Sequence, residues 1–579
     1  MTPITKSWLL SGLFGFLAAC GSPAERKLEA DQGAPGPSAL NPAPRVSVDT
    51  TAPSETCAQN PLLAKCSPTT SSGSALAPAG NSAGAPGGAL DPEQPPPGDR
   101  YTTPGTNPFV MVAYDPLSTF AVDVDTASYD IFRRDAQGGS LPAPASVRVE
   151  EYVNYFAYDY PQGEFDAEVP FAIHLAAAQS PLGASRTLLR VALQGKKAPP
   201  ASAKKPANLV FLMDVSGSMS SADKLPLAQQ LVTQTLDLLE PTDTVSLVTY
   251  ASGTSVRLGP TAVSERATIV QAIAALSAGG STAGASGIEL AYQQATAGFL
   301  QEGLNHVILC TDGDFNVGTS STEQLLELIR EKRRTGVTFT ALGFGAGNLN
   351  DAMLEAISNA GNGFYGVISS EEQAARYVDE RMLSTLSLIA RDMKVQVEFN
   401  PEQVLAYRLI GYENRAIADQ DFRDDAVDAG EIGAGHRVTA LYELVLPGSS
   451  VPDASGAPPA ESGAPYTGEQ EVAGPDLVQV KIRYKHFDAG TEDPALEVAA
   501  SLAPDAIATD LDAADPDLAW AISTAAFAEL LKGSPFADPT ALEAISGVFA
   551  AQRERDTDRQ EFYELFQTAR GLMPAGPRP

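Results

Sequence analysis

The stretch Leu209-Val-Phe-Leu-Met-Asp-Val-Ser-Gly-Ser218 decides the fold of this 579-residue chain. Its first five residues form a continuous apolar run, as expected for a strand that is buried on both faces of a parallel sheet. The run leads into Asp214, Ser216 and Ser218, a D-x-S-x-S arrangement of one carboxylate and two hydroxyls. Ligands of open α/β sheets bind outside the carboxyl ends of the strands. We therefore expect these three side chains to converge on one hard cation.

Alternating strand and helix patterns surround this motif. Apolar runs at 244–250, 306–311 and 337–342 predict further strands, with Cys310 as a buried apolar residue in one of them. Repeated strand–helix units with short loops are typical of an α/β fold with a doubly wound parallel sheet. We assign residues 206–391 to this domain, with helices expected at 225–239, 267–276, 285–300, 323–334, 351–359 and 371–389.

Two residues in other strand–helix loops complete the candidate metal ligands. Thr282 stands in Gly279-Gly-Ser-Thr282 before a predicted helix, and Asp312 stands in Thr311-Asp-Gly-Asp314 after a predicted buried strand. Hydroxyls are weak neutral ligands, so a hard cation needs these extra oxygen donors. The predicted metal site therefore comprises Asp214, Ser216, Ser218, Thr282 and Asp312.

The order D-x-S-x-S, then Thr, then Asp resembles the metal-ion-dependent adhesion site of von Willebrand factor type A (VWA) domains, and all five positions match. In that family the hydroxyls bind the ion directly and the aspartates act partly through water. The resemblance implies a divalent cation, Mg²⁺ first, with Mn²⁺ or Ca²⁺ as alternatives. It also implies an open coordination position for an Asp or Glu carboxylate of a protein partner.

A calcium loop would use some of the same residues differently. Asp312, Asp314, Asn316 and Glu323 occupy positions 1, 3, 5 and 12 of an EF-hand-like loop. Position 6, where glycine makes the sharp turn, is Val317, and the preceding segment is predicted to be a strand. We therefore favour the adhesion-type site.

Folded regions are predicted on both sides of the α/β domain. Residues 105–205 combine strands and short helices in an α+β region. From residue 393 the apolar period changes to two, which indicates antiparallel strands of a sandwich-like domain. Helices follow at 518–531, 539–549 and 560–572, so residues 392–575 form a β-rich and helical carboxy-terminal domain, with a loop at 448–474. We expect Asp123, Asp125 and Asp517 to cap helices instead of binding a metal. Thr126 or Ser128 is an alternative cap for the helix that is predicted to run through Arg134.

These flanking regions extend the resemblance. Asn107-Pro-Phe109, Asn154-Tyr-Phe156 and Thr311-Asp-Gly-Asp-Phe-Asn-Val-Gly318 look like segments of a bacterial VWA lipoprotein family. That family has a von Willebrand amino-terminal region before the VWA domain and a carboxy-terminal domain of unknown function. The similarity covers residues 105–575, with the insert 448–474 as a departure in length.

The amino terminus has the pattern of a targeting signal. A positive charge at Lys6 precedes the apolar run 8–17, which suits a signal peptide and is too short to span a bilayer. It ends in Leu17-Ala-Ala-Cys20, which resembles the lipobox of bacterial lipoproteins. We expect residues 1–20 to be the signal and Cys20 to carry the lipid anchor, with an ordinary signal peptide cleaved nearby or a core helix as the alternatives. Gly21 in place of aspartate favours, by family rule, the outer membrane of the cell envelope.

Residues 21–104 have the composition of a disordered tether. Positions 21–100 contain 14 proline and 9 glycine residues and no aromatic residue. Such a segment cannot bury enough apolar area to offset its ordering entropy. Cys57 and Cys66 lie nine residues apart within it. In an oxidising compartment they either form a local disulfide or stay as two free thiols.

Composition and missing motifs limit the function classes. The chain has 39 Lys and Arg residues against 71 Asp and Glu residues, a net charge of −32. This acidity argues against nucleic acid as a partner, because neutralising phosphates needs clustered basic side chains. Its one G-x-S-x-G match, at 80–84, lies in the tether, and no histidine stands near Ser216. We expect a protein-binding module and not an enzyme. A structural protein with a merely stabilising cation and a hydrolase are the alternatives.

Replacing Cys20 by Ser should release the protein from the membrane fraction, because lipid at Cys20 is the only anchor that the sequence predicts. Fractionation of cells followed by immunoblotting measures this, with Cys57→Ser as the control that stays membrane-bound. If a well-expressed Cys20→Ser variant fractionates like the wild type, the lipoprotein prediction is wrong.

Overall fold

The computed structural model describes residues 98–122, 125–161, 169–181, 183, 186–197, 205–281, 284–313, 322–425, 427, 429–453, 466, 468, 472, 474–489 and 493–573. All described residues belong to the unit Asp91–Pro579. The predicted signal, Cys20, Cys57, Cys66 and most of the predicted tether therefore lie outside the described residues. Among the described helices, none combines the length and apolar character needed to cross a bilayer.

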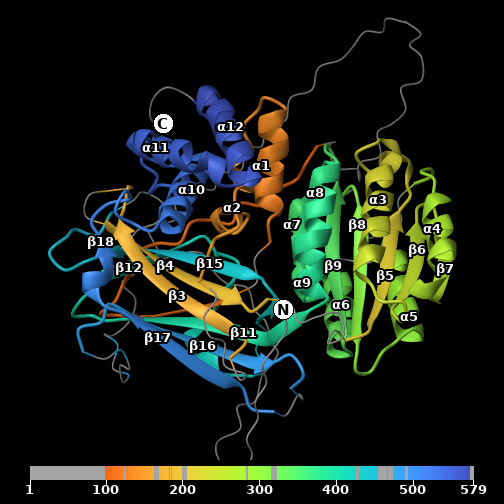
Figure 1. The fold of residues 1–579 in the computed structure, drawn as a ribbon, viewed down its shortest axis with the longest axis horizontal. Helices are drawn as coiled ribbons and strands as arrows, with labels where there is room; N and C mark the ends of the chain where they lie inside the picture. Colours follow the sequence, from red (N-terminus) through yellow and green to blue (C-terminus); the bar gives the residue numbers. More distant parts are fainter. Residues whose placement is uncertain are drawn as a thin grey trace, which may run out of the picture. The chain divides into compact units, whose positions relative to one another are not determined.

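The predicted doubly wound sheet is present (Figure 1). Its strand order is β10-β9-β8-β5-β6-β7, and all neighbours are parallel except β7, which runs antiparallel to β6. Every residue of β5 is buried, as predicted for a strand covered on both faces. The strands are β5 (Ala207–Asp214), β6 (Thr244–Tyr250), β7 (Thr254–Ala262), β8 (Leu304–Thr311), β9 (Val337–Phe344) and β10 (Tyr365–Ile368).

Helices cover both faces of this sheet. Phe211 and Met213 pack into one apolar core and Val210 and Leu212 into another, because successive side chains of a strand point to opposite faces. Cys310 on β8 is a buried free cysteine, as predicted. The first core is closed by α3 (Leu225–Thr235), α4 (Arg266–Ala274) and α8 (Glu371–Arg376), and the second by α5 (Ala285–Ala297), α6 (Thr322–Arg334) and α7 (Asp351–Ala360).

The segment after α8 differs from the prediction of one helix over 371–389. Helix α8 continues into a π-helical stretch (Tyr377–Met382) and the short α9 (Leu383–Thr385). Strand β11 (Leu388–Phe399) then begins, and it pairs with three other strands. The hydrogen bonds of these ladders outweigh the helical pattern of the sequence. The predicted domain boundary at 391/392 consequently lies inside β11.

Two further sheets form the predicted sandwich. Their strand orders are β1-β12-β15-β4-β3-β18 and β13-β2-β11-β16-β17, with β14 paired to β11. Val191 of one sheet and Val395 of the other belong to the same buried apolar cluster. The strands are β1 (Val110–Met111), β2 (Leu117–Ala121), β3 (Phe171–Gln179), β4 (Arg186–Gly195), β12 (Ala406–Ile410), β13 (Ala416–Ile417), β14 (Gly430–Gly433), β15 (Arg437–Val445), β16 (Val478–His486), β17 (Leu496–Leu502) and β18 (Ile507–Ala508).

Both sandwich sheets contain strands from before and from after the α/β domain, and some of these pair with each other. Strand β2 lies between β13 and β11, and Phe120 is paired with Val395. Strand β4 lies between β15 and β3, with Leu189 opposite Tyr442. The predicted regions 105–205 and 392–575 therefore share one core. No local sequence pattern could predict this, because the pairing joins segments separated by the whole α/β domain.

A group of helices packs beside the sandwich (Figure 1). Trp520 is its centre, with ring centroids 5.2 Å from Phe156 and 5.1 Å from Phe549. The helices are α1 (Ala127–Gln137), α2 (Val149–Val153), α10 (Pro516–Lys532), α11 (Leu542–Gln552) and α12 (Thr557–Leu572).

The predicted caps of two helices are wrong. Asp515, not Asp517, caps α10, because its side chain accepts from the N–H groups of Asp517 and Leu518. The Asp517 carboxylate instead accepts from arginine side chains of the α12 region. Asp125 does not cap α1; the N-cap residue is Thr126, one of the predicted alternatives, although its side chain makes no capping hydrogen bond. Asp123 lies outside the described residues.

A buried ion triad joins α10 to the first sandwich sheet. Arg408 of β12 donates to Glu443 of β15 at 2.9 Å and to Glu529 of α10 at 3.1 Å. All three side chains are at most 1% exposed. Each carboxylate has a further partner, Arg186 for Glu443 and Ser534 for Glu529.

Replacing Arg408 by Met should lower the free energy of unfolding by about 3–5 kcal/mol, because it removes the cation that two buried carboxylates share. Equilibrium denaturation measures the loss. Arg423→Met is the control, since the pair of Arg423 with Glu497 is more exposed and contributes at most about 1 kcal/mol. Equal losses for the two variants would contradict the assignment of Arg408.

Candidate metal centre

Four of the five predicted ligands lie in the described part of the chain, at the carboxyl ends of two adjacent strands. Asp214 is the last residue of β5, Ser216 and Ser218 follow in the next turn, and Asp312 follows β8. Strands β5 and β8 pair in parallel, so both aspartates emerge at the same edge of the sheet. Thr282 lies outside the described residues, as do Asp314 and Asn316 of the calcium-loop alternative.

Hydrogen bonds hold the Asp214 carboxylate in one orientation. Its Oδ1 accepts from the backbone N–H of Ser216 at 2.8 Å, and its Oδ2 accepts from the Thr311 hydroxyl at 3.1 Å. The residue is fully buried. Burial raises the pKa of Asp214 to about 6, and the nearby Asp312 carboxylate acts in the same direction.

The serine hydroxyls have the spacing of neighbouring ligands on one small cation. Ser216 Oγ and Ser218 Oγ are hydrogen-bonded to each other at 2.9 Å, a separation that two ligands of one cation can also have. Octahedral Mg²⁺ with oxygen ligands at about 2.05 Å has neighbouring ligands about 2.9 Å apart. Ser216 is buried and Ser218 is half-buried, so the site opens toward solvent at Ser218. Carboxylate and hydroxyl oxygens at this spacing fit a hard divalent cation.

The segment that leads to Thr282 is bonded to the serine turn. The N–H of Gly217 donates to the carbonyl of Gly280 at 3.0 Å, and the N–H of Gly279 donates to the carbonyl of Val215 at 2.8 Å. Gly280 has a φ of +93°, which glycine adopts without strain. These two backbone bonds hold Gly279 and Gly280 against the turn that carries Ser216 and Ser218.

Sequence reasoning missed one residue of this site, Lys224. Its Nζ donates to Asp312 Oδ2 at 2.9 Å, and both side chains are buried. Lys224 is the N-cap residue of α3. A lysine six residues beyond Ser218 has no sequence signature as a site residue, and only the turn before α3 directs it toward Asp312.

A second acidic group lies elsewhere in the described residues. Carboxylate oxygens of Asp125, Glu151 and Glu355 all lie within 4.8 Å of one another. Arg415 donates to Asp125 at 2.7 Å, and Arg148 is paired with Glu151 and lies 3.7 Å from Glu355. Two guanidinium groups against these carboxylates disfavour a further cation. We therefore interpret this cluster as a set of ion pairs that holds separate segments of the chain together, and not as a metal site.

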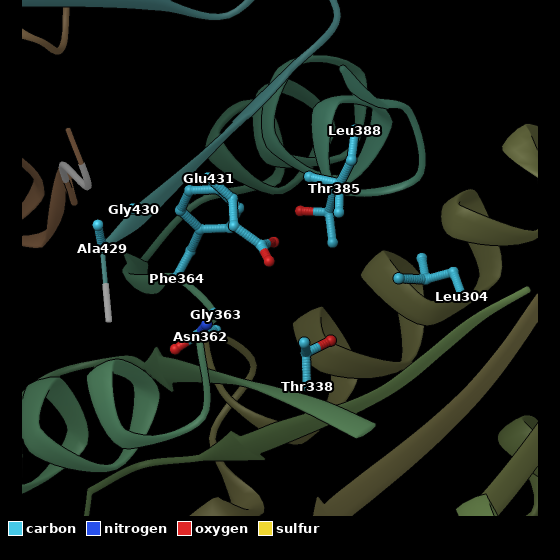
Figure 2. A pocket seen from close by; sticks show the side chains of 10 residues that line it. All are labelled: Leu304, Thr338, Asn362, Gly363, Phe364, Thr385, Leu388, Ala429, Gly430 and Glu431. Atoms are coloured by element: carbon cyan, nitrogen blue, oxygen red, sulfur yellow. The ribbon is translucent and has the colours of Figure 1, made fainter. Parts of the chain in front are cut away.

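The small hollow in Figure 2 lies away from the predicted ligands. It has a volume of about 20 Å³, and Thr338, Phe364, Thr385 and Glu431 are among its lining residues. A space of this size holds about one water molecule. It therefore offers no room for a substrate or peptide.

The fold and this site define a protein built on a VWA domain. Residues 208–380 match the family model of the von Willebrand factor type A domain, residues 96–190 match the one described as von Willebrand factor, and residues 384–572 match the C-terminal domain of the uncharacterized protein YfbK. VWA domains mediate protein interactions, often through a metal-ion-dependent adhesion site, and commonly bind a divalent cation.

The chain belongs to the YfbK family. It is 37% identical to the uncharacterized protein YfbK of Escherichia coli K12 over 485 residues, which cover 82% of this chain and 81% of that protein. It is also 30% identical over 190 residues to the uncharacterized protein sll0103 of Synechocystis, covering 33% and 44% of the two chains. Among solved structures, a von Willebrand factor type A protein from Catenulispora acidiphila is 17% identical, with 70% of this chain and 91% of that chain covered and a TM-score of 0.40. The family resemblance and the fold class predicted from the sequence are confirmed.

The pKa of Asp214 predicts that metal binding depends on pH. A protonated carboxyl is a poor ligand without charge, so the cation competes with the proton below about pH 6. We expect the affinity for Mn²⁺ to fall about tenfold from about pH 7 to about pH 5, as measured by calorimetry. Equal affinities at the two pH values would contradict the raised pKa.

The stability of the metal-free protein should fall as the pH rises, whereas the affinity for the metal should increase. The pKa of Asp214 lies above its ordinary value of 3.8, so the folded state holds an extra proton between pH 3.8 and about 6. The contribution of Asp214 to stability is therefore present below this window and is lost as the pH rises through it.

Proposed function

We propose that this protein is a lipid-anchored envelope protein whose VWA domain binds a protein partner through a divalent cation. The observation that carries the proposal is the convergence of Asp214, Ser216 and Ser218 in one turn, with Asp312 at the end of the adjacent strand. This donor set suits Mg²⁺, and Mn²⁺ or Ca²⁺ are the alternatives.

The charge of the site explains why a partner would bind there. Asp214 and Asp312 supply two negative charges, Lys224 beside Asp312 supplies one positive charge, and the serine hydroxyls are neutral. When bound, the divalent cation would supply a Lewis-acidic position for an oxygen ligand from outside the chain. An Asp or Glu side chain of a partner protein has the charge and the hard oxygen that such a position attracts.

A binding role is favoured over catalysis. Ser216 Oγ lies beside another serine hydroxyl, and both oxygens of Asp214 accept hydrogen bonds from within the site. His306 of β8 lies between the hydroxyls of Thr338 and Thr340, and burial lowers its pKa to about 4. We infer that Ser216 is a metal ligand and not a nucleophile.

The envelope location rests on the sequence. The signal-like segment and Leu17-Ala-Ala-Cys20 support a lipid anchor, and Gly21 supports the outer membrane. The net charge of −32 supports a protein partner over nucleic acid.

Asp312→Ala tests the metal site. Saturating Mn²⁺ should raise the stability of the wild type, by about 2.7 kcal/mol at a hundredfold excess over Kd, and should leave Asp312→Ala unchanged. The variant also deprives Lys224 of its partner, so the readout is the metal-induced shift in melting temperature and not the starting value. Ser218→Ala should lose less of the metal-induced shift in melting temperature, because the hydroxyl that it removes carries no charge. Asp505→Ala, an exposed carboxylate of the sandwich, is the matched control.

Capture experiments separate the proposed function from its alternatives. Immobilised wild type should retain an envelope protein in Mg²⁺ and release it with a chelator, and Asp312→Ala should retain none. A cation that stabilises the protein without altering capture would favour a structural role. Calorimetry that finds no divalent cation bound to the wild type would remove the site assignment.

A further inference from the structure

Lys224 places its buried ammonium group next to a candidate ligand of the metal centre. Its Nζ lies 2.9 Å from Asp312 Oδ2, and the two residues are 7% and 2% exposed. Asp312 is one of the two carboxylates on which the site depends. An ion pair with this ammonium group therefore already offsets part of the charge of the ligand set.

The position of Lys224 is unfavourable for a lysine by local criteria. It is the N-cap residue of α3, where Ser, Thr, Asp and Asn are preferred because their side chains bond the free N–H groups. The positive end of the helix dipole also repels a cation at this position. The ion pair with Asp312 offsets both effects, so the lysine is placed there by its contact with the metal site.

The surrounding chain is shaped to admit this side chain. Gly345, directly after β9, has a φ of +72°. A Cβ atom at this position would lie 2.8 Å from Lys224 Cγ and 2.9 Å from Lys224 Cε. Any larger residue at 345 would press on the lysine stem. The segment following β9 thus leaves room for the lysine stem, and Asp312, following β8, binds its ammonium group.

The charge of the site follows from these contacts. Asp214, Asp312 and Lys224 together carry a formal charge of −1, and a divalent cation would bring the total to +1. Without the lysine, the same ion would leave the site neutral. An anion is therefore attracted more strongly to the loaded site when Lys224 is present.

We propose that Lys224 is a fixed counter-cation that sets the specificity of this site. It weakens the hold on the divalent cation and leaves the loaded site with a net positive charge, which selects a carboxylate from the partner. This inference rests on the proposed function, because it requires a cation at the D-x-S-x-S turn.

The test compares neutral and charged replacements of Lys224 in the full chain. Lys224→Met keeps the apolar stem without the charge, Lys224→Gln keeps a hydrogen-bond donor, and Lys224→Arg keeps the charge. We expect both neutral variants to bind Mn²⁺ about tenfold more tightly than the wild type by calorimetry, and Lys224→Arg to stay close to it. Two neutral variants are used because one of them could fail to fold.

Anion binding is measured with acetate as the probe. Acetate that takes a coordination position displaces water from bound Mn²⁺, and the water-proton relaxation rate reports this loss. The neutral variants should need several-fold more acetate than the wild type for the same change. Without metal, Lys224→Met should melt at a lower temperature than the wild type, and saturating Mn²⁺ should narrow the difference.

The outcomes separate this inference from the proposed function. If the wild type binds Mn²⁺ and both neutral variants bind it and acetate with unchanged affinity, Lys224 has only a structural role and the inference is wrong. If the wild type binds no divalent cation, the proposed function is wrong and the inference falls with it. Tighter Mn²⁺ binding together with weaker acetate binding supports both.

Discussion

The parallel pairing of β5 with β8 is the interaction on which the candidate site depends. Met213 is paired with Cys310, so Asp214 and Asp312 leave the sheet side by side, and the Thr311 hydroxyl of one strand bonds the Asp214 carboxylate of the other. Apolar cores on both faces hold this register, because a slip would expose them. The same pairing buries Asp214, which raises its pKa, and the nearby Asp312 carboxylate adds to this effect. Lys224 and the proposed cation are the two ways in which the chain offsets that charge.

The rest of the chain fixes the position of the VWA domain against its neighbouring segments. Arg148, from the amino-terminal region, donates through two nitrogens to Asp351 at the start of α7, and Arg415, from beyond the VWA domain, bonds Asn359 near its end. Buried ion pairs contribute little net stability compared with apolar packing, but breaking one is costly because it leaves an unpaired charge. Such a network therefore specifies one arrangement of the segments. The shared sandwich core serves the same end, since strands from both sides of the VWA domain complete its two sheets.

Several sequence predictions were wrong for a common reason. The helix predicted over 371–389 ends at Thr385, because the residues from Leu388 onward pair with other strands. Asp125 was expected to cap α1, but it accepts hydrogen bonds from the N–H of Tyr365 and from Arg415. In each case a partner distant in sequence outweighed a local preference. Periodicity and capping preferences depend only on residues that are near in sequence, so they cannot predict such partners.

The sequence by itself determined the VWA class, the strand that carries Asp214, and the identity of the candidate ligands, because each depends on residue type and spacing within a short window. The fully buried run 209–213 and the D-x-S-x-S turn after it admit few other folds. Only the tertiary structure decided that the flanking regions share one sandwich and that Lys224 reaches Asp312. Both depend on contacts between segments that are separated along the chain. The energies of those contacts come from desolvation and packing, which are established only when the chain is folded.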